Sequence, residues 1–239
     1  MRKPVISKYG QQAILIQWES IISPEINQLV VDTSNYLNEH FGSAILEIVP
    51  SYQSLVIYLN EGFTPTSLIT ELENTNWSID SSLKTSSIWR IPVCYDASFG
   101  LDLESISQTR ELSIESIIKL HTEPDYRIYG IGFLPGFLYL GGLNEQLFSP
   151  RRRVVKRFAP KGSVAIGGQQ TGIYPQESPG GWNIIGRTPI ELFDTKVNPP
   201  TPFSIGDSVR FFEINRHEYA EIEQEVKLSA YNLTSISND

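Results

Sequence analysis

The first third of the chain alternates short apolar runs with segments whose apolar residues recur at helical spacing. Residues 13–18 (AILIQW) form an apolar run that is typical of a strand. A helix is predicted to begin after Ser23, because this hydroxyl residue is a favourable N-cap and Pro24 suits the first turn. The other elements that the pattern predicts here are a helix that begins at Thr64 and Pro65, and strands at 45–49, 54–59 and 86–95.

This order of elements, β-α-β-β-α-β, is that of a ferredoxin-like domain. We therefore predict a small N-terminal α/β domain over residues 1–86. The polar segment 73–87 (ENTNWSIDSSLKTSS) is the expected linker, because its Ser, Thr and Asn content disfavours regular structure.

The pattern changes after Pro124, where short apolar runs alternate with turns until about residue 214. Thirteen of the 17 glycines and nine of the 15 prolines lie between Gly130 and Gly206. Short strands between Gly and Pro turns predict a closed or nearly closed β-barrel. Two short helices are expected before it at 98–122, and a surface helix after it at 215–226. The predicted fold class is α+β, with a barrel domain at 87–225 and a polar tail at 226–239, of which residues 229–239 are expected to be frayed.

Composition narrows the function classes. The net charge of −8 argues against a general nucleic-acid binder, and no apolar run approaches the length of a membrane span. The N-terminus has no apolar core of a secretory signal, so a cytoplasmic location is expected. The single cysteine, Cys94, excludes an internal disulfide framework and a CxxC metal site. The three histidines are far apart in the sequence, so no metal site is expected.

A basic run at 150–161 (PRRRVVKRFAPK) is the first candidate for chemistry. It holds six of the 19 Lys and Arg residues and no acid. Local positive charge in an acidic protein attracts an anionic substrate such as a phosphate or a carboxylate. The alternative is a solvated edge strand, where such charges oppose aggregation. Arg151 and Lys161 are the functional choices, because each lies beside a Pro or Gly turn.

Glycine-rich segments are the second candidate. Gly130, Gly132 and Gly136 lack the spacing of the dinucleotide fingerprint, and no P-loop motif occurs, so a nucleotide site here would be unconventional. The segment SPGGW (178–182) is either an anion nest of backbone N–H groups or a plain turn.

His121 is the third candidate, as a general acid or base near neutral pH. The alternative for it is a structural, hydrogen-bonded histidine. Further polar side chains lie among the turns of the barrel region: Gln169, Gln170, Tyr174 and Glu177.

Long motifs in these segments resemble the family of the 5-oxoprolinase B subunit. They are GFLPGFLYLGGL (132–143), PRRR at 150–153, and PKGSVAIGGQQTGIYPQESPGGWNIIGRTPIELFD (160–194). The resemblance covers residues 5–215, and the family also includes allophanate hydrolase subunit 1-like proteins and a Kip-type inhibitor of a histidine kinase. It implies a small N-terminal α/β domain followed by a cyclophilin-like β-barrel, in agreement with the pattern above.

The resemblance also implies a function. The B subunit pairs directly with a C subunit, and an A subunit joins them to cleave 5-oxo-L-proline to L-glutamate with hydrolysis of ATP, which is a co-substrate expected to arrive with Mg²⁺. A stabilised lactam opens more readily once its oxygen is phosphorylated, a step that needs cations on phosphate, hydrogen-bond donors and a positioned acid or base. We expect the chain to be inactive alone.

The candidate residues follow from these considerations. The expected catalytic residues are His121, Arg151 and Lys161. The expected substrate- or nucleotide-binding residues are Gly136, Phe137, Gln169, Gln170, Thr171, Tyr174, Glu177, Gly180, Gly181, Trp182 and Arg187. Two other functions stay open: an inhibitor that docks on a sensor histidine kinase and blocks its autophosphorylation, and a carboxyl-transfer role in the allophanate or urea pathway.

Overall fold

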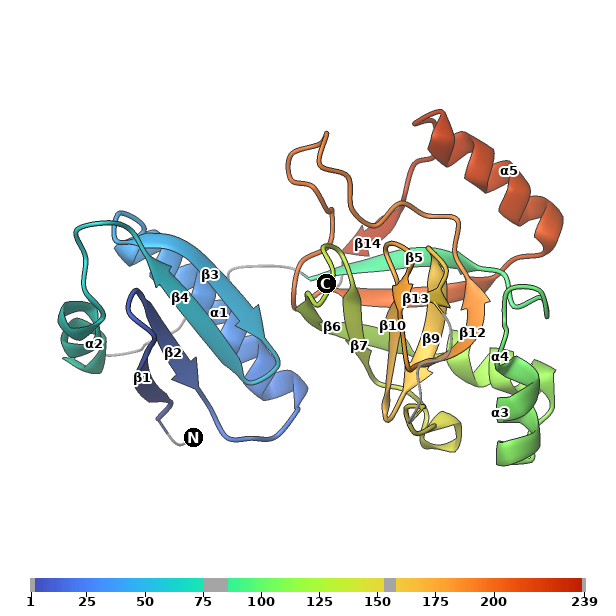
Figure 1. Ribbon diagram of the computed structural model, residues 1–239, viewed down its shortest axis with the longest axis horizontal. Coiled ribbons are helices and arrows are strands. Elements are labelled where there is room, and N and C mark those ends of the chain that lie inside the picture. Colours follow the sequence, from blue (N-terminus) through green and yellow to red (C-terminus); the bar gives the residue numbers. More distant parts are fainter. Residues whose placement is uncertain (1–2, 75–85, 153–157, 238–239) are drawn as a thin grey trace. The chain divides into compact units, whose positions relative to one another are not determined.

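The structure is a computed structural model that describes residues 3–74, 86–152 and 158–237. The chain forms two compact units, Met1–Thr85 and Ser86–Asp239. The first unit is blue in Figure 1, and the second runs from green to red.

The N-terminal unit is a four-stranded sheet with two helices. Strands β1 and β4 both pair with β2, and β3 pairs with β4, so that the order is β1-β2-β4-β3 and every pair is antiparallel. Helix α1 packs against β3 and β4, and α2 packs against β1 and β2. The core between them includes Ile14, Ile57, Val30, Leu37 and Leu72. The elements are β1 (Val5–Tyr9), β2 (Ala13–Gln17), α1 (Pro24–Phe41), β3 (Ile45–Ser51), β4 (Ser54–Leu59) and α2 (Pro65–Asn74).

The predicted β-α-β-β-α-β order is wrong at both of its ends, although the fold class is confirmed. β1 was not predicted, because only Ile6 of this edge strand packs on the core and its other residues read as polar or exposed. The strand predicted at 86–95 belongs to the second unit. In a ferredoxin-like sheet the last strand pairs beside the first, and here β1 takes that place. The sheet is therefore ferredoxin-like with its final strand moved to the start of the chain.

The second unit is a seven-stranded barrel with three α-helices. Its sheet runs β12-β9-β10-β7-β6-β13-β5, and a bridge between Cys94 and Arg187 closes β5 onto β12. Only the β5–β13 pair of this ring is parallel. The elements are β5 (Ser87–Val93), α3 (Leu103–Arg110), α4 (Ile114–Thr122), β6 (Asp125–Ile131), β7 (Leu138–Gly141), η1 (Glu145–Leu147), β8 (Phe158–Ala159), β9 (Ser163–Gly167), β10 (Gln170–Ile173), β11 (Ser178–Pro179), β12 (Asn183–Arg187), β13 (Ser208–Glu213), α5 (Arg216–Lys227) and β14 (Ser235–Ser237).

Helices α3 and α4 lie side by side next to the barrel (Figure 1). They contribute Leu103, Ile106 and Ile117 to the same buried cluster as the inward side chains of the strands. The barrel interior is therefore a packed core rather than a channel. Residues that face into it from the strands include Val93, Tyr126, Ile128, Leu138, Leu140, Val164, Ile166, Ile173, Ile185 and Phe211.

The expectation of a frayed tail is wrong for the residues that the structure describes. After α5 the chain returns to the barrel, where β14 pairs antiparallel with β5 and extends the sheet. Tyr231 and Leu233 pack against the main core cluster. These two apolar residues, spaced by two as in an extended strand, account for the docking, and the polar composition of the segment masked them.

Candidate functional site

Four aromatic side chains pack together on the outer side of the barrel sheet, where Phe137, Tyr174 and Trp182 are buried (2%, 2% and 7% exposed) and Tyr139 is half-buried. Along β7, Leu138 and Leu140 point into the core, whereas Tyr139 points to the other side. The same alternation places Tyr174 after β10 and Trp182 before β12 on this outer surface, with Ala165 of β9 beneath them. We call the group formed by Phe137, Tyr139, Tyr174 and Trp182 the aromatic face.

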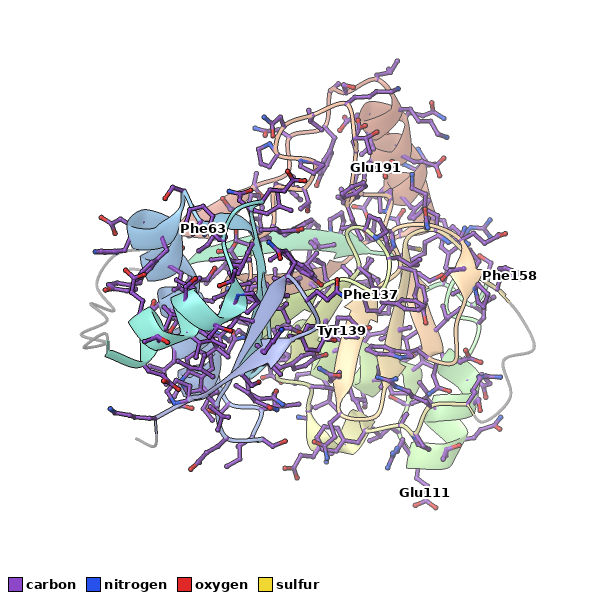
Figure 2. All side chains as sticks on the ribbon, turned by 60° about the vertical axis from the view of Figure 1, so that its left-hand side comes forward. Phe63, Glu111, Phe137, Tyr139, Phe158 and Glu191 are labelled. Atoms are coloured by element: carbon purple, nitrogen blue, oxygen red, sulfur yellow. The ribbon has the colours of Figure 1, made fainter. Side chains whose placement is uncertain are left out.

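The rings of the aromatic face are in direct contact. Phe137 is the centre, with its ring centroid 4.7 Å from that of Tyr139, 5.1 Å from that of Tyr174 and 5.6 Å from that of Trp182. The last two contacts are edge-on, an arrangement that aromatic pairs favour. Phe137 and Tyr139 are labelled side by side in Figure 2.

Glycines make room for these rings. A Cβ atom on Gly167 would lie 2.4 Å from the Trp182 ring, and one on Gly180 would lie 2.4 Å from the Tyr174 hydroxyl oxygen. Real Cβ atoms do not approach other atoms so closely. The glycine density of this region thus serves close packing of aromatic rings, in addition to turns.

Arg151 places a positive charge on the aromatic face. Its guanidinium carbon lies 5.1 Å from the centroid of the Trp182 ring, within the range of a cation–π interaction. Burial raises the pKa values of Tyr139 and Tyr174, and the charge of Arg151 partly opposes both shifts. Both hydroxyls are thereby kept protonated as hydrogen-bond donors near neutral pH. Because Phe137, Tyr174 and Trp182 are buried, the groups of this cluster that face solvent are the exposed Arg151 guanidinium and the half-buried Tyr139.

The neighbouring Arg152 fixes the segment that carries Arg151. Its guanidinium pairs with the Asp102 carboxylate, and its backbone N–H donates to Gly181 O at 2.7 Å. Asp102 also accepts from Ile184 N at 2.8 Å. The three other cations of the basic run, Arg153, Lys156 and Arg157, lie outside the described residues.

Phe133 extends the aromatic face into solvent. It has a φ of 69° and is 67% exposed, and its ring packs edge-on against Phe137 at 5.9 Å. A left-handed backbone is costly for a bulky residue and is often found at functional sites. The following turn is closed by Phe137 N donating to Leu134 O, with Gly136 at a φ of 83°. Phe158, next to the buried Ala159, is a second aromatic at the surface, with 59% exposure (Figure 2).

His121 lies in the core of the barrel and has no exposed surface. Its Nδ1 is 2.7 Å from the Tyr95 hydroxyl, its Nε2 is 3.0 Å from Thr171 Oγ1, and its ring stacks on Phe211. Burial lowers its pKa to about 3, so the ring is neutral near pH 7. Thr171 donates to Ala165 O, which makes Nε2–H the donor to Thr171 and Nδ1 the acceptor from Tyr95. The geometry corrects the expected catalytic role: His121 and Thr171 form an internal network that does not reach the surface.

The other predicted residues do not form one site. Lys161 and Arg187 line a separate groove next to α5. Gln169 is exposed at the turn between β9 and β10, Gln170 is half-buried at the start of β10, and Glu177 is exposed in the loop before β11. The structure thus joins Phe137, Tyr174 and Trp182 with Arg151, and Gly136, Gly180 and Gly181 belong to the segments beside these rings. It places His121, Thr171, Lys161 and Arg187 elsewhere.

Of the two alternatives for SPGGW, the anion nest is not formed. A nest needs a residue with left-handed backbone among its successive N–H groups. Neither Gly180 nor Gly181 has a positive φ, and Gly180 packs closely against the Tyr174 side chain. The alternative of a plain connection is the one the structure shows.

Three residues of this surface were missed in the sequence. Asp102 reads as a helix start, but it makes no side-chain capping bond and is buried under Arg152. Tyr139 and Phe133 read as barrel residues within GFLPGFLYL. The spacing of Phe133, Phe137 and Tyr139 around a Pro-Gly turn is the signal that indicates an aromatic group on one side of the strand.

Within the described ranges, no group of three or more His, Cys, Asp or Glu side chains is arranged to hold a metal ion. In the same part of the chain, no helix has the length and apolar character needed to span a bilayer.

Residues 4–203 match the family described as carboxyltransferase domain, subdomain C and D. The chain is 33% identical to the 5-oxoprolinase B subunit of Bacillus subtilis over 232 residues, which is 92% of this chain and 97% of that protein. The chain therefore belongs to this carboxyltransferase family and, within it, to the family of the 5-oxoprolinase B subunit.

Two solved structures show similar folds. The crystal structure of TTHA0988 aligns with a TM-score of 0.75 and 30% identity, over 86% of this chain and 40% of that one. The urea amidolyase of K. lactis aligns with a TM-score of 0.80 and 18% identity, over 98% of this chain and 16% of that one. This chain thus spans less than half of either solved protein, and the second likeness concerns the fold alone.

Proposed function

We propose that this chain is the B subunit of an ATP-dependent 5-oxoprolinase, which opens 5-oxo-L-proline to L-glutamate with hydrolysis of ATP. The observation that supports it most strongly is the 33% identity to the Bacillus subtilis protein over 97% of that protein's length. In this proposal the chain acts with a C subunit, which it contacts directly, and with an A subunit. It contributes one part of a composite site and is inactive alone.

The chemistry assigns a role to the aromatic face. Attack of water on the lactam carbon is slow until ATP phosphorylates the amide oxygen, which makes this carbon more electrophilic. The C–N bond then breaks with the nitrogen leaving as the protonated amine, and hydrolysis of the resulting acyl phosphate releases phosphate and L-glutamate. The phosphoryl transfer from ATP gains from a cation that is already held in place where negative charge develops. Arg151 is held above the Trp182 ring and is positioned by the adjacent Arg152–Asp102 pair. We assign it to a carboxylate or phosphate oxygen of the bound substrates.

The exposed aromatics fit an interface with a partner protein of the complex. Phe133 and Phe158 both expose more than half of their surface. Aromatic residues and arginine are the side chains that most often dominate binding energy at interfaces. A partner seated on the aromatic face would cover Phe133 and exclude water around Arg151, which strengthens its electrostatic effect.

ATP and Mg²⁺ belong, in this proposal, to the assembled complex. Arg151 is the residue of this chain that would meet a phosphate. His121 takes no part, because it is enclosed in the core. Lys161 is 55% exposed but pairs with Glu191, so it is not assigned to the reaction.

The test is reconstitution of the activity. The chain is co-expressed with its A and C partners, and L-glutamate formed from 5-oxo-L-proline is measured with and without ATP. We expect ATP-dependent glutamate from the complex and none from this chain alone. Failure of a well-assembled complex to form glutamate would reject the proposal, and inhibition of a purified sensor histidine kinase by the chain alone would support the regulatory alternative.

A matched pair of variants tests Arg151. Arg151→Gln is expected to lower kcat/KM of the complex by about 10- to 100-fold, since one charged contact to a reacting group is worth roughly 1.5–3 kcal/mol. Arg90→Gln is the control, because Arg90 is also stacked on an aromatic ring, at 5.2 Å from the Phe212 centroid. Equal kcat/KM values for the two variants would remove Arg151 from the site.

A further inference from the structure

A groove lies between the end of β12 and helix α5, apart from the aromatic face. Its volume is about 300 Å³, near the lower end for small-ligand sites. Figure 2 labels Glu191 next to α5 on this side of the barrel. The lining residues that carry charge or a hydroxyl suited to a ligand are Lys161, Arg187, Glu191, Tyr219, Glu223 and Lys227.

Backbone bonds hold the three walls of the groove together. Arg187 exchanges hydrogen bonds with Cys94 at 3.0 and 2.8 Å, where the barrel closes. Thr188 N donates to Gly162 O at 2.9 Å, which fixes the Lys161 turn beside β12. Helix α5 begins at a capping box of Asn215 and Glu218. The side chains that line the groove therefore project from ordered elements.

Arg187 provides the guanidinium of the groove. Its guanidinium carbon lies 5.2 Å from the centroid of Phe99, and it lies beside the Tyr219 hydroxyl, whose pKa it lowers against the larger opposing effect of burial. Among the described residues, no carboxylate pairs with it within 4.0 Å. A stacked guanidinium has lost much of its rotamer freedom, so a carboxylate that binds it loses less entropy.

The other charges of the groove are paired. Lys161 pairs with Glu191, and Lys227 pairs with Glu223. The lining therefore carries one net positive charge, that of Arg187, with two carboxylates nearby. A doubly charged phosphate would meet repulsion from both acids, whereas the ammonium group of a zwitterion would share the two carboxylates with the lysines that pair with them.

From this arrangement we infer that the groove binds a free α-amino acid, with its carboxylate on Arg187 and its ammonium group between Glu191 and Glu223. The inference goes beyond the proposed function and stands without it, because it concerns this chain alone. Tyr219 supplies a hydroxyl to the bound carboxylate. The site is separate from the aromatic face and is available in the isolated chain.

The test is an NMR titration of the ¹⁵N-labelled chain with L-glutamate as the probe. We expect saturable shifts of the backbone amides of Lys161, Arg187 and Lys227. N-acetyl-L-glutamate, which lacks the ammonium charge, and inorganic phosphate should each bind at least about tenfold more weakly. Absence of saturable shifts, or phosphate binding as tightly as L-glutamate, would overturn the inference.

Two variants and one control localise the binding. Arg187→Gln should weaken L-glutamate binding by about tenfold or more, whereas Arg216→Gln, at the exposed start of α5, should not. Because Arg187 lies at the barrel closure, Glu223→Gln serves as a second variant on the surface of α5. It should weaken L-glutamate but leave N-acetyl-L-glutamate unchanged. Unchanged L-glutamate binding in Glu223→Gln would contradict the assignment of the ammonium group.

Discussion

The carboxylate of Asp102 joins two segments that are distant in the sequence: it pairs with the Arg152 guanidinium and accepts a hydrogen bond from Ile184 N at 2.8 Å. Asp102 is 2% exposed, whereas the Arg152 side chain is 40% exposed. A carboxylate removed from water to this extent depends on such partners. The pair therefore fixes the segment that carries Arg151 against β12 and the start of α3.

Asp102→Asn is expected to destabilise the barrel by about 2 kcal/mol, since hydrogen bonds to a buried charge are worth roughly 1.5–3 kcal/mol. The measurement is the midpoint of urea unfolding. Asp125→Asn is the control, because the Asp125–Arg210 pair has side chains 32% and 47% exposed and should contribute less than about 1 kcal/mol. Equal losses in the two variants would contradict the special role of Asp102.

His121 predicts a pH dependence of stability. In the folded protein the pKa of His121 is about 3, below its ordinary value of 6.5. Between these two pH values the unfolded chain therefore binds more protons than the folded chain. The contribution of the neutral, buried His121 to the free energy of unfolding is fully present above pH 6.5 and is lost as the pH falls towards 3. Near pH 5 the loss from this group is about 2 kcal/mol.

The measurement is urea unfolding between pH 7 and 5. His121→Gln should flatten the pH dependence, since the glutamine does not titrate. If His121→Gln instead kept the full slope, the buried histidine would not be its source.

The left-handed backbone at Phe133 predicts that substitution of this residue by glycine does not destabilise the protein. At a φ of 69° the backbone is strained for phenylalanine and free for glycine, and the ring is 67% exposed, so little burial is lost. Phe133→Gly should leave stability unchanged or raise it by up to about 1 kcal/mol. The assay is thermal unfolding of the single chain.

Phe158→Gly is the matched control for this substitution. Phe158 is 59% exposed in β8 and does not have a positive φ, so glycine should cost about 0.5–1 kcal/mol there. A loss of stability in Phe133→Gly as large as in Phe158→Gly would show that the left-handed backbone at Phe133 carries no strain.

The helices and strands whose formation depends on residues close to them in the sequence were predictable. Ser23 caps α1 as expected, with its Oγ accepting from Ile26 N at 3.2 Å, and Ser113 caps α4 in the same way, with its Oγ accepting from Ser116 N at 3.1 Å. The barrel followed from the alternation of apolar runs with Gly and Pro turns. β1 was missed because most of its residues are polar or exposed, although it forms a hairpin with the following strand β2. β14 was missed because it is a short edge strand that is stabilised by pairing with the distant β5.

The site was only partly predictable, because its contacts are long-range. Arg151 and Lys161 looked equivalent in one basic run, yet Arg151 lies over Trp182 and Lys161 pairs with Glu191. His121 has the sequence context of either a catalytic or a core residue. The burial of its side chain depends on hydrogen bonds to Tyr95 and Thr171, which are 26 and 50 residues away in the sequence. Local patterns do not contain such distances.

Gly167 and Trp182 offer a test of the close packing under the aromatic face. A Cβ at Gly167 would lie 2.4 Å from the Trp182 ring, so Gly167→Ala must displace the ring and should cost about 1–3 kcal/mol. Trp182→Ala should cost about 3–5 kcal/mol through lost burial. In the double variant the methyl group occupies space that the ring has left. The combined cost should therefore fall short of the sum by about 1 kcal/mol or more.

The cycle is measured by urea unfolding, with Gly132→Ala as the control. A Cβ at Gly132 meets no atom within 4 Å, and its φ is not in the left-handed region, so this variant should change stability by less than about 0.5 kcal/mol. Because Gly132→Ala reports the effect of the substitution without a steric clash, the difference between it and Gly167→Ala isolates the contact with Trp182. If the stability losses of Gly167→Ala and Trp182→Ala were strictly additive in the double variant, the glycine would be required for its backbone conformation and not for the space that the Trp182 ring occupies.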